Sequence, residues 1–564
     1  MFQHDVIIVG GGLAGLRAAI EASALVDTAV ISRVHPLRSH TKAAQGGINA
    51  ALGNAEAGRD DNPDKHASDT IKGSDFLADQ DAVELMTRIA PECIFELEHW
   101  GCAFSRTDEG KIAQRPFGGA GFPRTCYGAD RTGLYLLQTV YEQSVKRNVK
   151  EYQEYFVTAL IVDEASCRGV IALNVKTGEL VPIAAKATIL ATGGAAWIYS
   201  ISTNSMINTG NGMTIAYRAG VPLKDMEFIQ FHPTGLYPSG LLITEGARGE
   251  GGYLVNSKGE RFMERYAPKA MELAPRDIVS RSIQKEIDEG RAFENAYVHL
   301  DLRHLGREKI VTGLPGIREI CLLFAALDPV EKPIPIRPAA HYTMGGIDCN
   351  SNCETSLRGL YAAGECSCIS VHGANRLGGN SLLDCVVFGK IAGQKASEFA
   401  KSVTGGTDQS LVQSFLEREQ KRVAAFQKAN GTEEPSTLRD EARAILTAKV
   451  GMFRSGQALE EALEDIRRLR ARFSKLRPLN LDNVFNLDLI RAFEVEAILE
   501  LAEVITASAL ARKESRGAHV HLDFPQRDDE RFLKHTLAHY TPSGPKLDYA
   551  EVKITRYKPE VRKY

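Results

Sequence analysis

The chain has no long uninterrupted hydrophobic run and no excess of charge of one sign. Its most apolar stretch, residues 187–201, is interrupted by Gly193 and Gly194, so it falls short of the roughly 18 apolar residues that a membrane-spanning helix needs. Lys and Arg number 68 against 71 Asp and Glu, for a formal net charge of −3. These absences argue against a spanning segment within the chain and against a global basic field that would attract nucleic acid or anionic lipid. We expect small molecules and proteins as partners, and no nucleic acid.

Cysteine is sparse, and no leader segment is visible. Ten cysteines in 564 residues are too few for a small secreted domain held together by disulfides, so a reducing compartment fits best. The opening residues, MFQHDVIIVGGG, pass directly into an apolar strand pattern without a basic or apolar leader. From this we expect cytoplasmic residence. Internal repeats and low-complexity tracts are also lacking.

The length exceeds what one hydrophobic core supports, so the chain should divide into several domains. Strand and helix signals alternate at first and return after residue 341, which predicts a split α/β domain over 1–234 and 342–404. Residues 235–341 are punctuated by glycine and proline and predict an inserted α+β domain with a helix over 277–289. A helical bundle should follow over 405–522, because Ile490, Phe493, Ala497, Leu501, Val504 and Ser508 recur at helical spacing. The last residues, 523–564, predict a surface tail or small β unit.

The N-terminus carries a candidate dinucleotide-binding turn. A short β-branched run, residues 5–9, leads into Gly10, Gly12 and Gly15, and a helical composition and a second strand at 28–31 follow. Such a βαβ unit is typical of a Rossmann-like fold, in which the glycines permit a tight turn and the helix N-terminus faces the phosphates. The acidic ribose ligand of ordinary NAD sites is missing, because Ser32 and Arg33 stand at the end of the second strand.

The next segment, RVHPLRSHTKAAQGGINAALG, resembles the flavin-attachment segment of succinate dehydrogenase and fumarate reductase flavoprotein subunits. The resemblance implies an FAD-binding domain with an inserted capping domain and a helical domain, and a covalent bond from His40 to the flavin. In this family that bond raises the flavin's reduction potential. The residues around the histidine are implied to contact the flavin as well: Ser39, Thr41, Gln45, Gly46 and Gly47.

Two later segments resemble other flavin-binding elements of two-domain flavoproteins. TILATGG, with Thr192 and Gly193, resembles a strand-to-turn element, and GLYAAGE resembles one whose acid, Glu365, holds the ribityl chain. The same resemblance implies contacts from Ser381 and Leu382 near the flavin pyrimidine. It also implies a contact from Asp225 on the adenosine side, although a helix-surface acid explains Asp225 almost equally well.

Four cationic or hydrogen-bonding side chains lie in strings that resemble the family's substrate site, in the same order: His232 in QFHPTG, Arg276 in APRD, His341 in AHYTMGG and Arg376 in HGANRLGGNSLLD. A C4 dicarboxylate is a compact dianion and needs several fixed donors of this kind. By resemblance His232, Thr244, His341 and Arg376 hold the carboxylates of succinate or fumarate. Arg276 is implied to move the proton, with Glu245 and Arg248 as its relay.

Electrons must also leave the flavin. Cys349, Cys353, Cys366 and Cys368 lack the spacing of ferredoxin-type clusters, and we interpret them as buried free thiols, with a structural zinc site as the sharper alternative. We expect no metal in this chain. The resemblance implies an iron-sulfur subunit as electron partner and a cytochrome b-type membrane anchor that exchanges electrons with quinone. The chain would then lie at the cytoplasmic face of the inner membrane, held there by its partners.

Two other functions remain open. An L-aspartate oxidase-like soluble flavoenzyme would share the arginines and histidines but resembles this sequence less at RSHT, because it holds FAD without a covalent bond. A non-catalytic flavin-binding scaffold would have no need for four convergent dianion ligands. The physiological direction is also open, although Gln45 favours succinate oxidation, since some fumarate-reducing relatives carry Glu at this place and some succinate-oxidising ones carry Gln.

Overall fold

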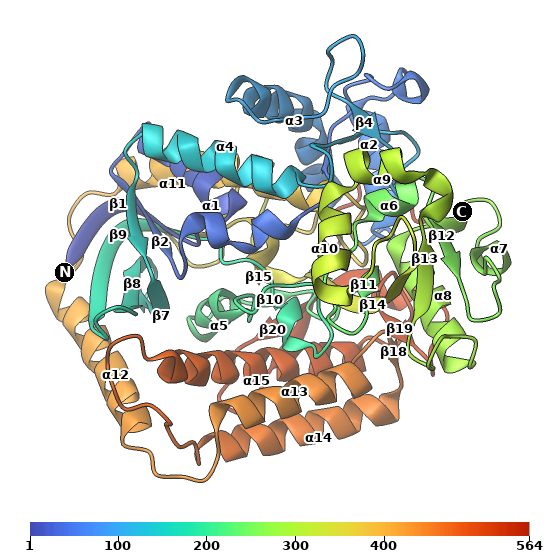
Figure 1. The fold of residues 1–564 in the computed structure, drawn as a ribbon. Coiled ribbons are helices and arrows are strands. Elements are labelled where there is room, and N and C mark those ends of the chain that lie inside the picture. The colour runs from blue at the N-terminus through green and yellow to red at the C-terminus, as the bar shows by residue number, and fades with distance from the viewer. Residues whose placement is uncertain (563–564) are drawn as a thin grey trace.

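The computed structural model describes residues 1–562 and begins with the expected βαβ unit (Figure 1). Strand β1 (Phe2–Val9), helix α1 (Leu13–Ser23) and strand β2 (Thr28–Ser32) follow one another, and β1 pairs with β2 in parallel. A Cβ atom at Gly15 would lie 1.8 Å from the Gly10 carbonyl oxygen. The third glycine therefore permits close packing of helix on strand, as the sequence predicted.

The central sheet has seven strands in the order β6-β2-β1-β9-β8-β7, with β16 beside β9. Strands β1, β2, β6 (Lys150–Gln153), β9 (Leu180–Leu190) and β16 (Leu360–Ala362) run parallel to one another. Strands β7 (Tyr155–Val162) and β8 (Cys167–Asn174) form an antiparallel meander with β9. Helix α11 (Asn380–Ser402) packs along α1 and also contacts α3 (Gln80–His99). Because α11 follows the inserted segment and returns to α1, the nucleotide-binding domain is assembled from both halves of the chain.

The inserted segment has a hydrophobic core of its own, built from residues between Leu236 and Ile336. It contains a four-stranded antiparallel sheet in the order β11-β14-β13-β12 and is completed by helices α6 to α10. The bounds are β11 (Ile229–Leu236), β12 (Tyr253–Val255), β13 (Val298–Asp301), β14 (Ile334–Thr343), α6 (Glu245–Gly249), α7 (Met263–Tyr266), α8 (Arg276–Asp288), α9 (Arg307–Gly313) and α10 (Pro315–Ala325). Strands β11 and β14 cross the expected boundaries at 235 and 341, and they connect the two domains.

The C-terminal helices form the expected bundle. They are α12 (Gln409–Gln427), α13 (Pro435–Lys449), α14 (Gly456–Phe473) and α15 (Leu487–Ala511). Helix α15 is buried nearly all round rather than along one stripe, because it packs on α13 and α14 on one side and on α5 (Asn211–Arg218) and strand β20 (Lys534–His539) on the other. Its buried carboxylates are paired: Glu500 accepts from Arg218 at 2.9 Å, and Glu503 accepts from Arg467 at 3.0 Å.

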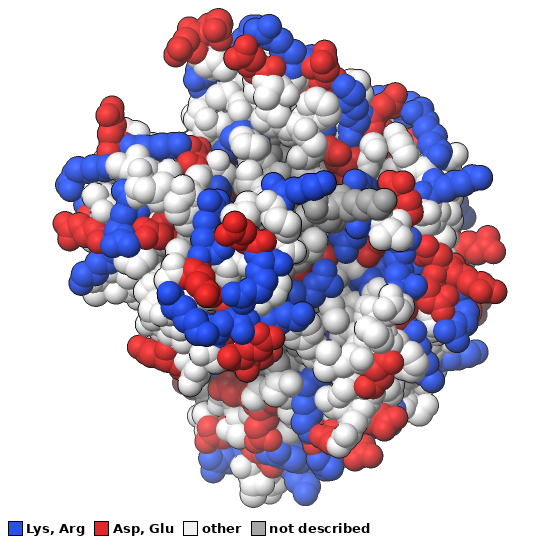
Figure 2. Space-filling view, turned by 90° about the vertical axis from the view of Figure 1, so that its right-hand side faces the viewer, with Lys and Arg blue, Asp and Glu red and all other residues white. Residues whose placement is uncertain are grey.

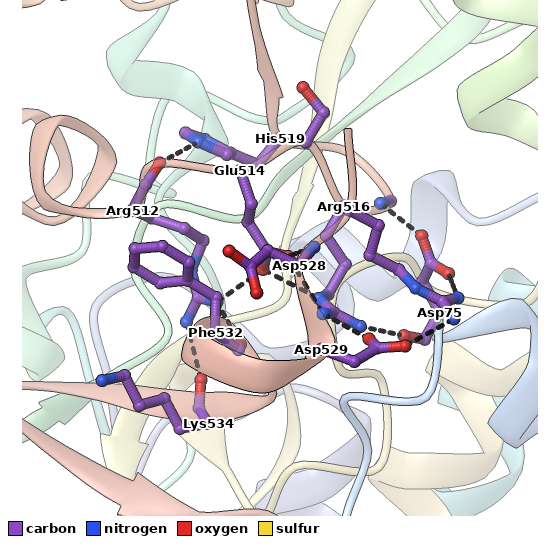
Figure 3. Close-up of polar contacts among 12 residues, drawn as sticks. Asp75, Arg512, Glu514, Arg516, His519, Asp528, Asp529, Phe532 and Lys534 are labelled. Carbon is purple, nitrogen blue, oxygen red and sulfur yellow. Dashed lines mark hydrogen bonds and ion pairs between the residues drawn. The ribbon is translucent and has the colours of Figure 1, made fainter. Parts of the chain in front are cut away.

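The last residues form a hairpin of β20 (Lys534–His539) and β21 (Lys546–Glu551). Of the two predicted alternatives, a surface tail or a small β unit, the structure has the β unit. Strand β20 also pairs with β10 (Leu223–Lys224) and so joins the sheet β17-β15-β10-β20-β21, where β15 is Gly346–Asp348 and β17 is Ser367–Cys368. Buried ion pairs hold the preceding loop: Arg512 donates to Glu227 at 2.6 Å and to Glu514 at 2.9 Å, and Glu514 also accepts from Arg516 (Figure 3). The C-terminal region is therefore part of the fold rather than a loose tail.

The remaining elements are α2 (Pro63–Gly73), α4 (Thr132–Lys146), α16 (Asp529–Phe532), β3 (Ile48–Asn49), β4 (Gln114–Arg115), β5 (Thr125–Cys126), β18 (Phe453–Arg454) and β19 (Val520–His521). On the face that Figure 2 shows, acidic and basic side chains are interspersed and neither sign dominates. Among residues 1–562, none of the helices is both long and apolar enough to cross a membrane.

Candidate active site

One large cavity, with about 1700 Å³ of empty space including its open mouth, lies between the nucleotide-binding domain and the inserted domain. It collects nearly all of the residues that the sequence singled out. They are Gly10, Gly12, Ser32, Ser39, His40, Thr41, Gln45, Gly46, Gly47, Thr192, Gly193, His232, Thr244, Glu245, Arg276, His341, Glu365, Arg376, Ser381 and Leu382. Gly15, Arg248 and Asp225 do not line it. The structure therefore brings together segments more than 300 residues apart in one continuous site.

The nucleotide end of the cavity lies where β1 and β2 end and α1 begins. The side chain of Ser32 donates to the Val34 carbonyl at 2.6 Å, and the neighbouring Arg33 forms an ion pair with Glu494 of helix α15. The hydroxyl of Ser32 thus has a backbone partner already. Because its proton is used, Ser32 would contact a ribose as a hydrogen-bond acceptor.

His40 begins a short 3₁₀ turn, His40–Ala43, at the cavity wall. Its Nδ1 atom accepts a hydrogen bond from the Ser205 backbone N–H at 3.3 Å. Burial lowers the pKa of His40 to about 4, so the ring is neutral at physiological pH. A neutral ring whose Nδ1 is an acceptor carries its proton on Nε2.

Several polar atoms of the cavity wall suit a large polar cofactor such as FAD. Within residues 1–562, the buried Oγ of Ser39, Oε1 of Gln45 and Oγ1 of Thr209 have no hydrogen-bond partner, and buried polar atoms of this kind are costly without one. Burial raises the pKa of Glu365 to about 7, although the Thr343 N–H donates to its carboxylate at 3.1 Å. These groups, with the glycine turn, fit a dinucleotide that carries hydroxyls and ring donors.

Asp225 is placed differently from the expectation. It follows β10 at φ 57° and is buried beneath the C-terminal hairpin. Its carboxylate accepts from His535 at 2.6 Å and from the Thr536 N–H at 3.0 Å. The adenosine contact is corrected on this ground: both carboxylate oxygens are engaged by β20, so Asp225 anchors the hairpin rather than facing the cavity.

The substrate end of the cavity holds Arg276 and Arg376, and a glutamine joins them. Gln230 Oε1 accepts from Arg276 at 3.1 Å and from Arg376 at 3.0 Å. The guanidinium of Arg376 also lies over the Tyr342 ring, 4.3 Å from its centroid. Burial, followed by the charge of Arg276, lowers the pKa of Arg376 to about 10. Gln230 was not among the predicted site residues, although it precedes His232 by two residues and so lies on the same face of a strand.

His232 and His341 face each other with ring centroids 4.8 Å apart. His232 lies on β11, and His341 is the extra residue of β14 at a register shift, because Gln230 is opposite Tyr342 whereas Phe231 is opposite Ala340. Such a β-bulge turns a side chain away from its regular direction. Burial, then the charge of Arg276, lowers the pKa of each histidine well below its usual value, so both rings are neutral. Nδ1 of His232 accepts from the Thr234 N–H at 3.2 Å, which leaves its proton on Nε2.

Helix α6 carries Glu245 and Arg248, the two residues that the sequence resemblance implies as a proton relay. The Thr244 side chain caps its N-terminus by accepting from the Gly246 N–H at 3.1 Å. Glu245 accepts from Arg276 at 2.6 Å and lies 3.8 Å from Arg248. Burial raises the pKa of Glu245, but Arg276 and Arg248 outweigh it and hold that pKa below its usual value, while burial lowers the pKa of Arg248.

The cysteines are thiols, as expected for the four near the flavin-binding strands. All ten are free; nine are buried and Cys385 is partly exposed. Burial raises the pKa of Cys366 to about 11. Within residues 1–562, no group of three or more His, Cys, Asp or Glu side chains is arranged to hold a metal ion.

The chain matches the FAD binding domain family over residues 5–382 and the fumarate reductase flavoprotein C-terminal family over residues 439–564. It is 46% identical to the succinate dehydrogenase flavoprotein subunit of Rickettsia bellii, over 99% of this chain and 97% of that protein. It is 43% identical to the fumarate reductase flavoprotein subunit of Mycobacterium tuberculosis, over 100% of this chain and 99% of that protein.

Solved structures agree with this. The quinol fumarate reductase subunit FrdA of E. coli superposes with a TM-score of 0.96 at 42% identity and covers 99% of this chain and 98% of its own. Sdh1 of Mycobacterium smegmatis gives 0.86 at 34%, covering 99% and 95%. The expected fold class, an α/β FAD-binding domain with a capping domain and a helical domain, is thereby confirmed. The chain belongs to the flavoprotein subunits of the succinate dehydrogenase and fumarate reductase family, the enzymes that interconvert succinate and fumarate.

Proposed function

We propose that this chain is the flavoprotein of a quinone-linked complex and interconverts succinate and fumarate at FAD attached covalently through His40. The observation that carries the proposal is the arrangement of Arg276, Arg376 and the two neutral histidines in the same cavity as His40. Arg276 and Arg376 each donate one N–H to the Gln230 oxygen. Each guanidinium has further N–H donors that can bind a dianionic substrate. Neutral His232 and His341 add donors without charge, so the carboxylates of a C4 diacid can be bound at two ends.

Bound FAD would supply the acceptor for the hydride that succinate loses. The protein's own residues hold the substrate and move the proton. In fumarate reduction Arg276 donates a proton to the substrate carbon opposite the one that gains hydride. It is reprotonated through Glu245, 2.6 Å away, after that carboxylate has taken up a proton from the solvent side. In succinate oxidation the same groups work in reverse, and Arg276 passes the abstracted proton to the Glu245 carboxylate.

Beyond Arg248, a series of contacts reaches the surface. Arg248 donates to the backbone carbonyl of Glu272, whose carboxylate accepts from Arg261 at 2.6 and 2.7 Å. The Arg261 side chain is 40% exposed. A guanidinium gives up a proton only at a large cost, and the lowered pKa of Arg248 reduces that cost within a buried relay.

His40 supports the covalent attachment. Ser205 fixes its Nδ1 as an acceptor, and the low pKa keeps the ring unprotonated. In this tautomer Nε2 carries the ring proton, and Nε2 would give up that proton when it bonds to the flavin 8α-methyl carbon. The neighbouring Ser39 and Thr41 also line the cavity.

An iron-sulfur subunit is proposed as the electron partner and a cytochrome b-type anchor as the link to quinone, with the chain held at the cytoplasmic face of the inner membrane through them. Relatives of this chain are named as quinol-fumarate reductase with menaquinol and as Sdh1 in complex with UQ1. Gln45 lines the cavity, and its Nε2 donates to the Leu242 carbonyl at 3.0 Å. We propose succinate oxidation as the favoured direction, because a neutral amide repels electron density on the flavin less than a carboxylate would.

Two measurements test the proposal. The protein is precipitated with acid, and the flavin absorbance of the pellet and the supernatant is compared; flavin in the pellet is expected, and release of all flavin would favour the L-aspartate oxidase-like alternative. Succinate-driven dye reduction is then compared with fumarate-driven oxidation of a low-potential reduced dye. Absence of both activities, with no binding of malonate or oxaloacetate, would point to a scaffold instead.

A further inference from the structure

Gln230 has every hydrogen-bonding position of its amide filled. Its oxygen accepts from Arg276 and Arg376, and its nitrogen donates to the Asn375 side-chain oxygen at 3.0 Å and to the Arg376 backbone carbonyl at 2.8 Å. Two donors surround the oxygen and two acceptors surround the nitrogen, so the amide can take only one orientation. A reversed amide would turn its N–H groups towards two guanidinium ions.

The orientation of the Asn375 amide is set in turn by two acceptors, Gly73 and Asp277. Its side-chain nitrogen donates to the Gly73 carbonyl at 3.1 Å and to Asp277 Oδ1 at 3.4 Å. Because both are acceptors, the Asn375 oxygen must point towards Gln230. Asp277 directly follows Arg276 in the first turn of helix α8, so the carboxylate that orients Asn375 is also fixed to the backbone of the proton-carrying arginine.

The other oxygen of Asp277 accepts from two arginines: Arg281, one turn further along α8, at 2.9 Å, and one from the far end of the chain. Arg562 donates to Asp277 Oδ2 at 2.8 Å and lies 3.2 Å from Asp75 Oδ2. These side chains are nearly enclosed, with exposed fractions of 11% for Arg562, 2% for Asp277 and 7% for Asp75. Asp75 is itself held firmly, by the Gly517 N–H and by Arg527, each at 2.9 Å (Figure 3). Arg562 therefore bridges a fixed point of the nucleotide-binding domain and the start of α8 in the capping domain.

We propose that Arg562, near the C-terminus, is a positioning residue for the dicarboxylate site and acts through Asp277, Asn375 and Gln230 on the guanidinium groups of Arg276 and Arg376. Each bond in the series has a fixed donor and acceptor, and Arg562 is the member that ties Asp277 to Asp75. Without Arg562, Asp277 is held at this oxygen only by Arg281 of its own helix. Small displacements of a reacting group cost rate steeply. The inference rests on the proposed assignment of Arg276 and Arg376 to the substrate.

The test uses the full-length holoenzyme, isolated with its FAD and accompanying subunits. Arg562→Gln removes the bridge, and Arg556→Gln is the matched control. Arg556 lies in the same C-terminal segment and makes exposed ion pairs with Asp64 at 3.1 Å and Glu84 at 3.4 Å. KM and kcat for succinate are measured, together with the Kd of malonate from the change in flavin absorbance.

We expect Arg562→Gln to lower kcat/KM about tenfold, through both a higher KM and a lower kcat, and to weaken malonate binding. Arg556→Gln should stay within about twofold of the parent. On a Gln230→Met background, Arg562→Gln should add less than twofold, because the contact through which it acts is already lost. Asp277→Asn breaks the same series of contacts at another point. It should reproduce the loss in kcat/KM if Arg562→Gln does not fold.

Equal kinetics for Arg562→Gln and Arg556→Gln would overturn the inference. A full additional loss on the Gln230→Met background would overturn it too, because Arg562 would then act by a separate route. Failure of the proposed function has a different result. In that case the parent protein itself would show neither succinate-driven dye reduction nor fumarate-driven oxidation of a reduced dye, whereas failure of the present inference leaves both activities of the parent intact.

Discussion

At the scale of single residues, the site works by placing charges where water cannot screen them. Burial lowers the pKa of Arg248 and Arg376 and keeps His232 and His341 neutral. Glu245 nevertheless stays ionised, because Arg276 and Arg248 outweigh its burial. The carboxylate is thus ready to accept a proton from a neighbouring guanidinium, which is the step that succinate oxidation needs.

Arg276→Lys should leave dicarboxylate affinity nearly unchanged and reduce turnover in both directions by about three powers of ten or more. Arg276 contacts Glu245 through Nε and Gln230 through its terminal nitrogen, and a single ammonium cannot replace both contacts. Steady-state kinetics and malonate titration separate the two effects. Arg303→Lys, at an exposed pair of the capping domain, is the control. Weaker binding with normal turnover would reassign Arg276 to anchoring.

His40→Ser should give a folded protein that binds FAD without a covalent bond, because the glycine turn at Gly10 to Gly15 does not depend on the histidine. Fumarate reduction should survive better than succinate oxidation, since the unattached flavin has a lower potential. Acid precipitation and the paired dye assays measure both effects. His99→Ser, at an exposed histidine, should keep the flavin attached. Equal losses in the two directions would refute the account.

The sequence predicted residues within recognisable strings well and their partners poorly. His40, His232, Arg276, His341 and Arg376 all line the cavity, because local motifs carry them there. Gln230 was missed although it stands in one of those strings, since its role depends on contacts with Arg276 and Arg376, 46 and 146 positions away. Asp225 was predicted to contact the cofactor rather than the C-terminal hairpin for the same reason: its partner His535 is 310 positions away.

At the scale of elements, short irregular pieces do the positioning. The bulge in β14 directs His341, and the short helix α6, capped by Thr244, carries Glu245 and Arg248. The βαβ unit and helix α15 could be predicted because their hydrophobic periodicity is local. The bulge and the pairing of β20 with β10 could not, because both depend on the register between segments distant in the chain.

The attachment of β20 should depend on pH. His535 lies between Asp225 at 2.6 Å and Asp79 at 3.2 Å. Burial opposes its charge, but these carboxylates raise the pKa of His535 to about 9. Because this folded-state pKa lies above the unfolded value near 6.5, the stabilisation is complete below about pH 6.5 and is lost as the pH rises through 9, a change of about 3 kcal/mol.

Denaturant unfolding between pH 6 and 10 measures this change. The parent should lose unfolding free energy across the window, whereas His535→Gln should be less stable at pH 6 and show a smaller decline. Because other groups also titrate near pH 10, the informative quantity is the difference between the two proteins. A constant difference from pH 6 to 10 would show that His535 is uncharged in the folded state.

At the scale of the whole molecule, the catalytic cavity lies between two hydrophobic cores. One core spans the nucleotide-binding domain and the helical bundle, and the other fills the capping domain. The cofactor residues come from the first domain, whereas Thr244, Glu245 and Arg276 come from the second. The site is therefore complete only when both domains are in place, and the C-terminal region contributes by holding them together through Arg562.

The physiological direction, succinate oxidation or fumarate reduction, is also a property of the whole molecule, because the reduction potentials of the flavin and of its electron partners together decide it. The chain's own contribution is Gln45, whose amide nitrogen is bonded to Leu242 and whose buried Oε1 has no partner within residues 1–562. Gln45→Glu would place a negative charge beside the flavin and would set a carboxylate against the Leu242 carbonyl. The negative charge disfavours added electron density on the flavin, so the flavin midpoint potential should fall.

The ratio of fumarate reduction to succinate oxidation should rise accordingly. Spectroelectrochemical titration of the flavin, with the paired dye assays on the same preparation, measures both quantities. Gln45→Met provides the control, because it removes the hydrogen bond to Leu242 without adding charge and should move the potential less than Gln45→Glu does. If the midpoint of Gln45→Glu stays the same or rises, the residue at position 45 does not set direction, and the potentials of the partner subunits alone must do so.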